Sequence, residues 1–218
     1  MLKLLLVIKD FSNWLHVERY RLQLALAGLT DLEVWHEPGN IHDIVKKIRF
    51  KPDFILLYLY GSINAPRVTG LDTLKIPYGV YVQDLHSLKS LHDQIVKNNI
   101  RYIFNCYRDM FLNVYPQFAD RMIWMPHHVD LSVYRDYGLK KEIPMLMMGA
   151  ANPVTYPLRH KMLRALAGRK DFVFHAHPGY RNIGAHEGKF VREKYAMEIN
   201  RAKLFLTCDS IYQYPVAK

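Results

Sequence analysis

The sequence predicts an α/β protein built on mainly parallel, doubly wound sheets. Short apolar runs of strand length alternate with helical periodicity along most of the 218 residues. Half of the residues are hydrophobic, and 15 Tyr and 10 Phe favour a packed α/β chain over a helical bundle. The polar segment 136–142 reads as a linker between two such alternations, so we expect domains at residues 1–138 and 139–218.

The first domain alternates strands with amphipathic helices. The run at 53–59 is its most strongly apolar strand, and Asn13 and Gly28 are expected to begin and end its first helix. Its loop at 9–14 lacks glycine, and the chain has no GxGxxG or Walker motif, which disfavours a dinucleotide or ATP site. Strands are expected at 3–8, 32–35, 53–59, 78–82, 102–105 and 121–124, and helices at 13–27, 41–50, 85–98 and 107–114.

The second domain begins with a strand, a loop and a helix at residues 144–168. Pro157 suits the first turn of this helix, and we expect its inner face to carry Leu158, Met162, Ala165 and Leu166. Strands at 172–176 and 204–207 flank a helix at about 189–199. The chain ends just as Pro215 would open another helix, so we expect this second domain to be incomplete.

The loop after strand 144–148 has the features of a phosphate site. Gly149 permits a tight turn, and Asn152 is a loop or cap residue before the helix. Arg159 lies in the first turn, where the positive end of the helix dipole disfavours a cation unless an anion is bound nearby. The alternative is an arginine that points into solvent.

Several groups of residues in the last third of the chain resemble the CgeB-like glycosyltransferases, which are GT-B enzymes. Weaker landmarks of that fold are Lys51–Asp53 at a strand start and Pro126 with 128–130 before the linker. The more specific groups are Gly149, 156–159, His175, 177–180, 200–203, Ser210, Tyr212 and 214–218.

The resemblance implies two facing Rossmann-like domains, with the second domain binding a nucleotide-diphosphate sugar and the first holding an acceptor. The acceptor class, whether glycan, protein or lipid-linked, is left open. In the family the helix opened by Pro215 continues into a stretch with a Glu that is expected to hold the donor, and the sequence up to Lys218 does not contain that stretch. The implied donor-binding residues are Gly149, Asn152, Tyr156, Arg159, His177, Ser210, Tyr212, Tyr214 and Lys218.

No Asp-x-Asp pair occurs, so we expect a metal-independent reaction in which helix N-termini and cations hold the diphosphate. Arg159 and Lys218 each lie in the first turn of a helix that follows a strand. Hydroxyls of Ser210, Tyr212 and Tyr214 are further donors, although ordinary packing of the tyrosines explains them nearly as well. His175 and His177 share a strand face but lack a third ligand at metal-site spacing, so no metal and no cofactor are expected.

Asp84 and His86 follow the strand at 78–82 and are the candidates for the general base that activates the acceptor hydroxyl. Asp84 serves equally well as a helix cap, and His16 is a third candidate with a similar alternative. We expect these side chains at the carboxyl edge of the first sheet.

The formal net charge of +10 lies mostly in the second domain. Residues 1–138 hold 16 Lys and Arg against 14 Asp and Glu, whereas residues 139–218 hold 14 against 6. This basic part suits nucleotide phosphates and also an anionic membrane surface, while no signature of specific nucleic-acid binding occurs. The two cysteines, which form no metal or redox spacing, and the lack of a signal-peptide core favour a cytoplasmic setting. A non-catalytic GT-B-like scaffold and, less well supported, a basic nucleic-acid-binding module are the alternative functions.

Overall fold

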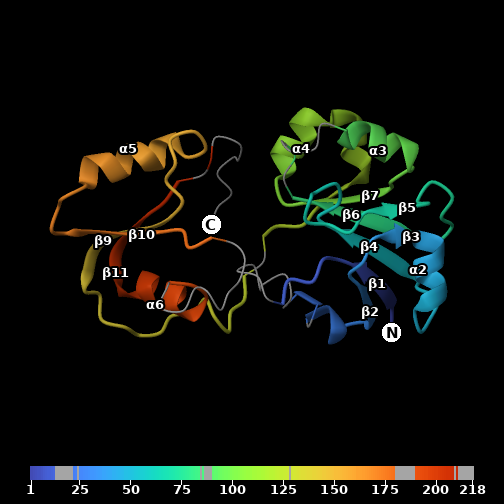
Figure 1. The fold of residues 1–218 in the computed structure, drawn as a ribbon, viewed down its shortest axis with the longest axis horizontal. Coiled ribbons are helices and arrows are strands. Elements are labelled where there is room, and N and C mark those ends of the chain that lie inside the picture. Colours follow the sequence, from blue (N-terminus) through green and yellow to red (C-terminus); the bar gives the residue numbers. More distant parts are fainter. Residues whose placement is uncertain are drawn as a thin grey trace. The chain divides into compact units, whose positions relative to one another are not determined.

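The computed structural model describes residues 1–12, 22–23, 25–83, 85, 90–127, 129–179, 190–208 and 210 (Figure 1). They form two compact units. Unit 1 comprises the described residues among Met1–Phe11 and Arg19–His128, and unit 2 those among Ser12–Glu18 and Val129–Lys218. Each unit is an α/β structure with its own parallel sheet, which confirms the predicted fold class at this level.

Unit 1 contains a six-stranded, fully parallel sheet in the order β2-β1-β4-β6-β7-β8. The strands follow the apolar runs of the sequence, and β6 and β7 have the predicted bounds. A second, two-residue parallel pair, β3 with β5, was not predicted because it is too short to show an apolar pattern. The bounds are β1 Lys3–Val7, β2 Asp31–Trp35, β3 Gly39–Asn40, β4 Phe54–Tyr58, β5 Val68–Thr69, β6 Tyr78–Val82, β7 Tyr102–Asn105 and β8 Met122–Trp124.

Two helices of unit 1, α2 and α4, are shorter than the sequence predicts. α2 begins at Ile41, where the Asn40 side chain accepts a hydrogen bond from the His42 amide at 3.0 Å, and it ends at Lys47 rather than at residue 50. The helix predicted at 85–98 is described only from Leu91. The helix predicted at 13–27 lies largely outside the described residues. The bounds are α2 Ile41–Lys47, α3 Leu91–Lys97, α4 Arg108–Val114 and the 3₁₀ helix η2 Pro116–Arg121.

The core of unit 1 joins the sheet to these helices. Leu5, Ile55 and Val80 from three adjacent strands are fully buried, and so are Ile95 of α3 and Phe111 of α4. α3 and α4 lie on the same side of the sheet (Figure 1). The apolar side chains from which the strands were predicted therefore also form the core that stabilises the sheet.

Unit 2 contains a three-stranded parallel sheet in the order β10-β9-β11, with α5 on one side and α6 on the other (Figure 1). β10 has its predicted bounds, and the other elements differ by a few residues. On the α6 side, Tyr195 and Ile199 pack against Ile143, Leu146 and Met148. The bounds are β9 Ile143–Gly149, α5 Pro157–Leu166, β10 Phe172–Ala176, α6 Glu193–Arg201 and β11 Ala202–Leu206.

The inner face of α5 differs from the predicted one. Leu158 is 56% exposed and Ala165 is exposed, whereas Arg159 is buried. Met162 and Leu166 are partly buried, in keeping with the prediction. The helix is therefore rotated so that a cation, rather than Leu158, faces the sheet at its first turn.

The segment predicted to be a linker is attached to unit 2. The Asn200 side chain of α6 accepts a hydrogen bond from the Tyr137 amide at 2.8 Å and donates one to the Arg135 carbonyl at 3.0 Å. Tyr134 packs edge-on against Tyr195 with ring centroids 6.4 Å apart. These contacts explain why the two units divide at residues 128–129, ten residues before the sequence-based boundary. None of the helices in the described ranges is both long and apolar enough to cross a membrane.

Gly79, in the middle of β6, has no room for a side chain. A Cβ there would lie 2.7 Å from Phe104 Cε2 and 3.0 Å from Tyr102 Cβ. Gly79→Ala should therefore lower the free energy of unfolding by about 1–3 kcal/mol in urea titrations. Gly28→Ala is the control, because its nearest atom would be 3.5 Å away, and it should change stability by less than about 1 kcal/mol. Equal losses for the two variants would contradict the packing at Gly79.

Burial raises the pKa of Tyr78 to about 12, and the charges of Tyr60 and Asp72 act in the same direction. Its hydroxyl donates a hydrogen bond to the Asn98 carbonyl. The unfolded tyrosine loses its proton near pH 10, whereas the folded one keeps it until about pH 12. The stability that protonated Tyr78 contributes is therefore present below pH 10 and is lost between about pH 10 and 12. Tyr78→Phe should cost about 1 kcal/mol at neutral pH and reduce the alkaline loss of stability. Urea unfolding across this pH range measures the free energy of unfolding of both proteins. If Tyr78→Phe loses as much stability between about pH 10 and 12 as the wild-type protein does, the prediction is wrong.

Candidate functional site

The carboxyl edge of the unit 2 sheet begins at Gly149, the last residue of β9. Its φ of +121° lies in a region that L side chains rarely adopt, and its carbonyl accepts a hydrogen bond from the His177 amide at 3.2 Å. A Cβ at this position would lie 3.1 Å from Nη1 of Arg159. The backbone conformation therefore favours glycine here, and a side chain would in addition make a tight contact with the guanidinium group.

The loop between β9 and α5 is organised by Asn152. Its side chain accepts a hydrogen bond from the Thr155 amide at 2.7 Å, and its carbonyl accepts one from the Tyr156 amide at 3.0 Å. Tyr156 then precedes Pro157, the first residue of α5, and makes no side-chain cap. Asn152 and Tyr156, both predicted donor-binding residues, thus set the direction in which α5 leaves this edge.

Arg159 is buried at the same edge, with 8% of its surface exposed. Nη1 donates a hydrogen bond to the Ala150 carbonyl at 2.8 Å, and Nη2 donates one to the Cys208 carbonyl. The guanidinium group also lies over the Tyr156 ring, 4.5 Å from its centroid. The solvent-exposed alternative is therefore excluded, and the side chain instead connects the loop after β9 to the loop after β11.

The charge of Arg159 is not balanced by a carboxylate among the residues described. Its hydrogen bonds go to neutral carbonyls, and its Nε–H is buried without an acceptor. A buried cation without an acidic partner is costly, because low-polarity surroundings disfavour the charged form and no ion pair offsets that cost. The positive field extends to Tyr195, whose pKa is raised by burial and partly lowered again by Arg159.

The remaining predicted donor-binding residues are only partly described. His177 follows β10 directly, and its Nδ1 accepts a hydrogen bond from the Gly179 amide at 3.0 Å. Ser210 is buried two residues beyond Cys208. Tyr212, Tyr214 and Lys218 lie outside the described residues. The structure therefore places Gly149, Asn152, Tyr156 and Arg159 at one edge, and the His177 amide is hydrogen-bonded to the Gly149 carbonyl there.

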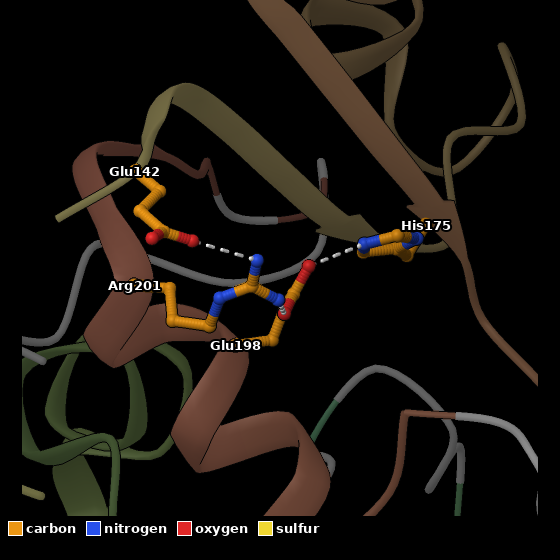
Figure 2. A network of polar contacts seen from close by, with 4 residues as sticks. All are labelled: Glu142, His175, Glu198 and Arg201. Carbon is orange, nitrogen blue, oxygen red and sulfur yellow. Dashed lines mark hydrogen bonds and ion pairs between the residues drawn. The ribbon is translucent and has the colours of Figure 1, made fainter. Parts of the chain in front are cut away.

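Behind this edge lies an ionic network that sequence reasoning missed (Figure 2). Glu198 of α6 is buried, and its two carboxylate oxygens lie 3.0 Å from His175 Nε2 and 2.9 Å from Arg201 Nη1. Arg201 also reaches Glu142 at 3.3 Å, and the hydrogen bond to Glu142 and the charge of Glu198 raise the pKa of Arg201. His175 stacks on Phe190 with ring centroids 3.9 Å apart.

This network connects α6 with β10 and with Glu142, the residue that precedes β9. His175 is thus paired with a carboxylate rather than with His177. No group of three His, Cys, Asp or Glu side chains in the described part of the chain could hold a metal ion. The i,i+3 spacing of Glu198 and Arg201 is the only sequence signal that could have suggested the network, and it is common on exposed helix faces.

The carboxyl edge of the unit 1 sheet carries a separate group of polar residues. Buried Asn105 donates a hydrogen bond to the Val82 carbonyl at 2.6 Å and accepts one from the Tyr107 amide at 2.7 Å. The Tyr107 hydroxyl lies 3.2 Å from His127 Nε2. Asp84 and His86, predicted to act as bases at this edge, lie outside the described residues, as does His16.

Comparison with known proteins adds no identification. No protein-family model matches the sequence, and no curated protein matches it significantly.

Removing the charge of Glu198 tests the network. Glu198→Gln should lower the free energy of unfolding by about 1–3 kcal/mol, because it weakens the contacts to both His175 and Arg201 inside the protein. In an Arg201→Met background the same change should cost less, since one of its partners is already absent. Urea unfolding of the four proteins gives both values. Additive losses would show that Glu198 and Arg201 act independently.

Proposed function

We propose that this chain belongs to a metal-independent glycosyltransferase of the GT-B type, with a nucleotide-diphosphate sugar as donor. The proposal is supported by the presence of two separate α/β units, each with its own parallel sheet. It also draws on the resemblance of the last third of the sequence to the CgeB-like glycosyltransferases. In this proposal unit 2 binds the donor and unit 1 binds the acceptor.

The observation that carries the proposal is the buried charge of Arg159 at the edge of the unit 2 sheet. Ligands of open α/β sheets bind at the carboxyl ends of the strands, and Gly149 and Arg159 lie there together. A diphosphate at this edge would offset the charge of the guanidinium group, which no carboxylate balances among the described residues. It would also lie at the start of α5, where the first-turn amides point away from the helix.

The chemistry proposed for this edge is electrostatic. In glycosyl transfer the bond between the anomeric carbon and the diphosphate oxygen breaks, and the diphosphate leaves with the bonding electron pair. A positive site that is already in place stabilises the charge that develops on that oxygen without reorganisation. Arg159 is suited to this role because its orientation is fixed by the Ala150 and Cys208 carbonyls and by the Tyr156 ring.

The other proposed donor contacts follow from their positions. Asn152 and Tyr156 shape the loop that would face the diphosphate, and His177 lies at the neighbouring strand end. Ser210, Tyr212, Tyr214 and Lys218 are proposed as further contacts from the segment that follows β11. Asp84 and His86 are proposed as the bases that accept the proton of the acceptor hydroxyl.

Donor binding by matched arginine variants tests the proposal. We expect at least one of UDP-glucose, GDP-mannose and dTDP-glucose to raise the melting temperature of the protein and to give a measurable Kd by calorimetry. Arg159→Lys should weaken that binding by about tenfold, because a lysine cannot keep both carbonyl contacts and the stacking on Tyr156. Arg164→Met is the control, since Arg164 lies on the exposed face of the same helix.

Thermal unfolding without ligand shows whether each variant is folded. If no diphosphate sugar binds the wild-type protein, or if Arg164→Met weakens binding as much as Arg159→Lys, the proposed donor site is wrong.

A further inference from the structure

The strand order of unit 1 creates a second place where a ligand is expected. From β1 the chain continues to β2 on one side, whereas β4 lies on the other side and is followed by β6, β7 and β8. The connections therefore leave the sheet in opposite directions at the carboxyl ends of β1 and β4. Such a topological switch point leaves a crevice between the diverging loops, and open α/β sheets bind ligands there.

A cavity of about 390 Å³ opens beside this switch point. Lys9 and Asp10 come from the loop after β1, His36 and Glu37 from the loop after β2, and Pro66 and Arg67 from the segment between β4 and β5. Its volume falls within the range of small-molecule sites. The loops of three different strands thus contribute polar side chains to one cavity, although they are far apart in the sequence.

The backbone around the cavity is held by hydrogen bonds between these loops. The Ile8 amide donates to the Trp35 carbonyl at 3.0 Å, and the Gly39 amide donates to the Arg67 carbonyl at 3.0 Å. The indole N–H of Trp35 donates to the Glu37 carbonyl at 2.8 Å. The lining is therefore largely preformed, which reduces the entropy lost when a ligand binds.

His36 presents a defined hydrogen-bond acceptor. Its Nδ1 lies 2.8 Å from the Ile8 carbonyl, which can only accept, so Nδ1 carries the proton. In the neutral ring Nε2 then bears a lone pair, and no donor to it occurs among the described side chains or amides. A ligand hydroxyl can supply that donor.

The charges of the lining are balanced. Lys9 and Arg67 contribute two positive charges, and Asp10 and Glu37 contribute two negative ones. This differs from the positive edge of unit 2 and disfavours a ligand with a strong net charge. Carboxylates that accept, cations that donate and a proline surface beside them suit a compound with many hydroxyl groups and an apolar C–H face.

We propose that this cavity binds a neutral, polyhydroxylated ligand such as a sugar or a glycoside, with one ligand hydroxyl donating to His36 Nε2 and others contacting Arg67 and Glu37. Under the proposed function, on which this last step rests, that ligand is the acceptor of the transferred sugar. Binding itself does not depend on transfer, so the two proposals can fail separately.

A second cavity supplies the matched control. It has the same volume of about 390 Å³, but Tyr78, Asn98 and Arg101 line it at the opposite, amino-terminal edge of the same sheet. Arg67 and Arg101 are both exposed, and neither side chain has a hydrogen-bond partner in the described part of the chain. Arg67→Met keeps the backbone carbonyl that binds Gly39, so the loop itself should be preserved.

The experiment is an amide NMR titration of the full chain with methyl α-glucopyranoside, methyl β-galactopyranoside and N-acetylglucosamine, and with glucose 6-phosphate as the anionic comparison. We expect at least one neutral probe to shift amide signals of the loops that contain Lys9, His36 and Arg67. His36→Phe and Arg67→Met should each weaken that binding by about fivefold or more, because each removes a hydrogen bond to the ligand. Arg101→Met should leave the affinity unchanged.

The proposal is overturned if none of the neutral probes shifts these signals, or if only glucose 6-phosphate does. It is also overturned if Arg101→Met weakens binding as much as Arg67→Met. A failure of diphosphate sugars to bind unit 2, together with sugar binding here, would reject the transferase proposal and leave the sugar site standing.

Discussion

The buried guanidinium group of Arg159 is the constraint on which the candidate site depends. It reaches the Ala150 carbonyl after β9 and the Cys208 carbonyl after β11, so two strand ends are held at a fixed separation. The guanidinium group lies close to Gly149, and α5 is turned so that Arg159 is buried while Leu158 faces outward. Because no acid balances its charge in the described residues, the same contact that organises this edge also makes it attractive to an anion.

Among the described residues, the buried charged side chain on the α6 side of the unit 2 sheet is paired with a charged partner, whereas the one on the α5 side is not. On the α6 side, Glu198 is paired with both His175 and Arg201, and Arg201 is shared with Glu142 (Figure 2). This network holds α6 through the buried carboxylate of Glu198, whereas its partners are partly exposed. On the α5 side the partners of Arg159 among the described residues are neutral carbonyl groups. In unit 1 the cavity beside β1 and β2 has balanced charges, which suits a neutral ligand rather than a phosphate.

The sequence predicted the strands well and the site only in part. β6, β7 and β10 have their predicted bounds because each is rich in aromatic residues, Val or Ile, which favour strands. The predicted inner face of α5 is wrong at Leu158 and Ala165, since periodicity assumes that Leu158 is buried in preference to Arg159. The cavity at His36 could not be predicted, because it depends on the strand order that brings residues 9, 36 and 67 together.

The measurement that tests the central claim most directly is the position of a bound nucleotide diphosphate on the chain. Amide NMR spectra recorded while UDP is added to the isotope-labelled protein would locate it. The account predicts that the largest changes fall on Gly149, Asn152 and the first turn of α5, with Arg159 among them. Changes confined to unit 1, or to the α6 side of the unit 2 sheet, would contradict it.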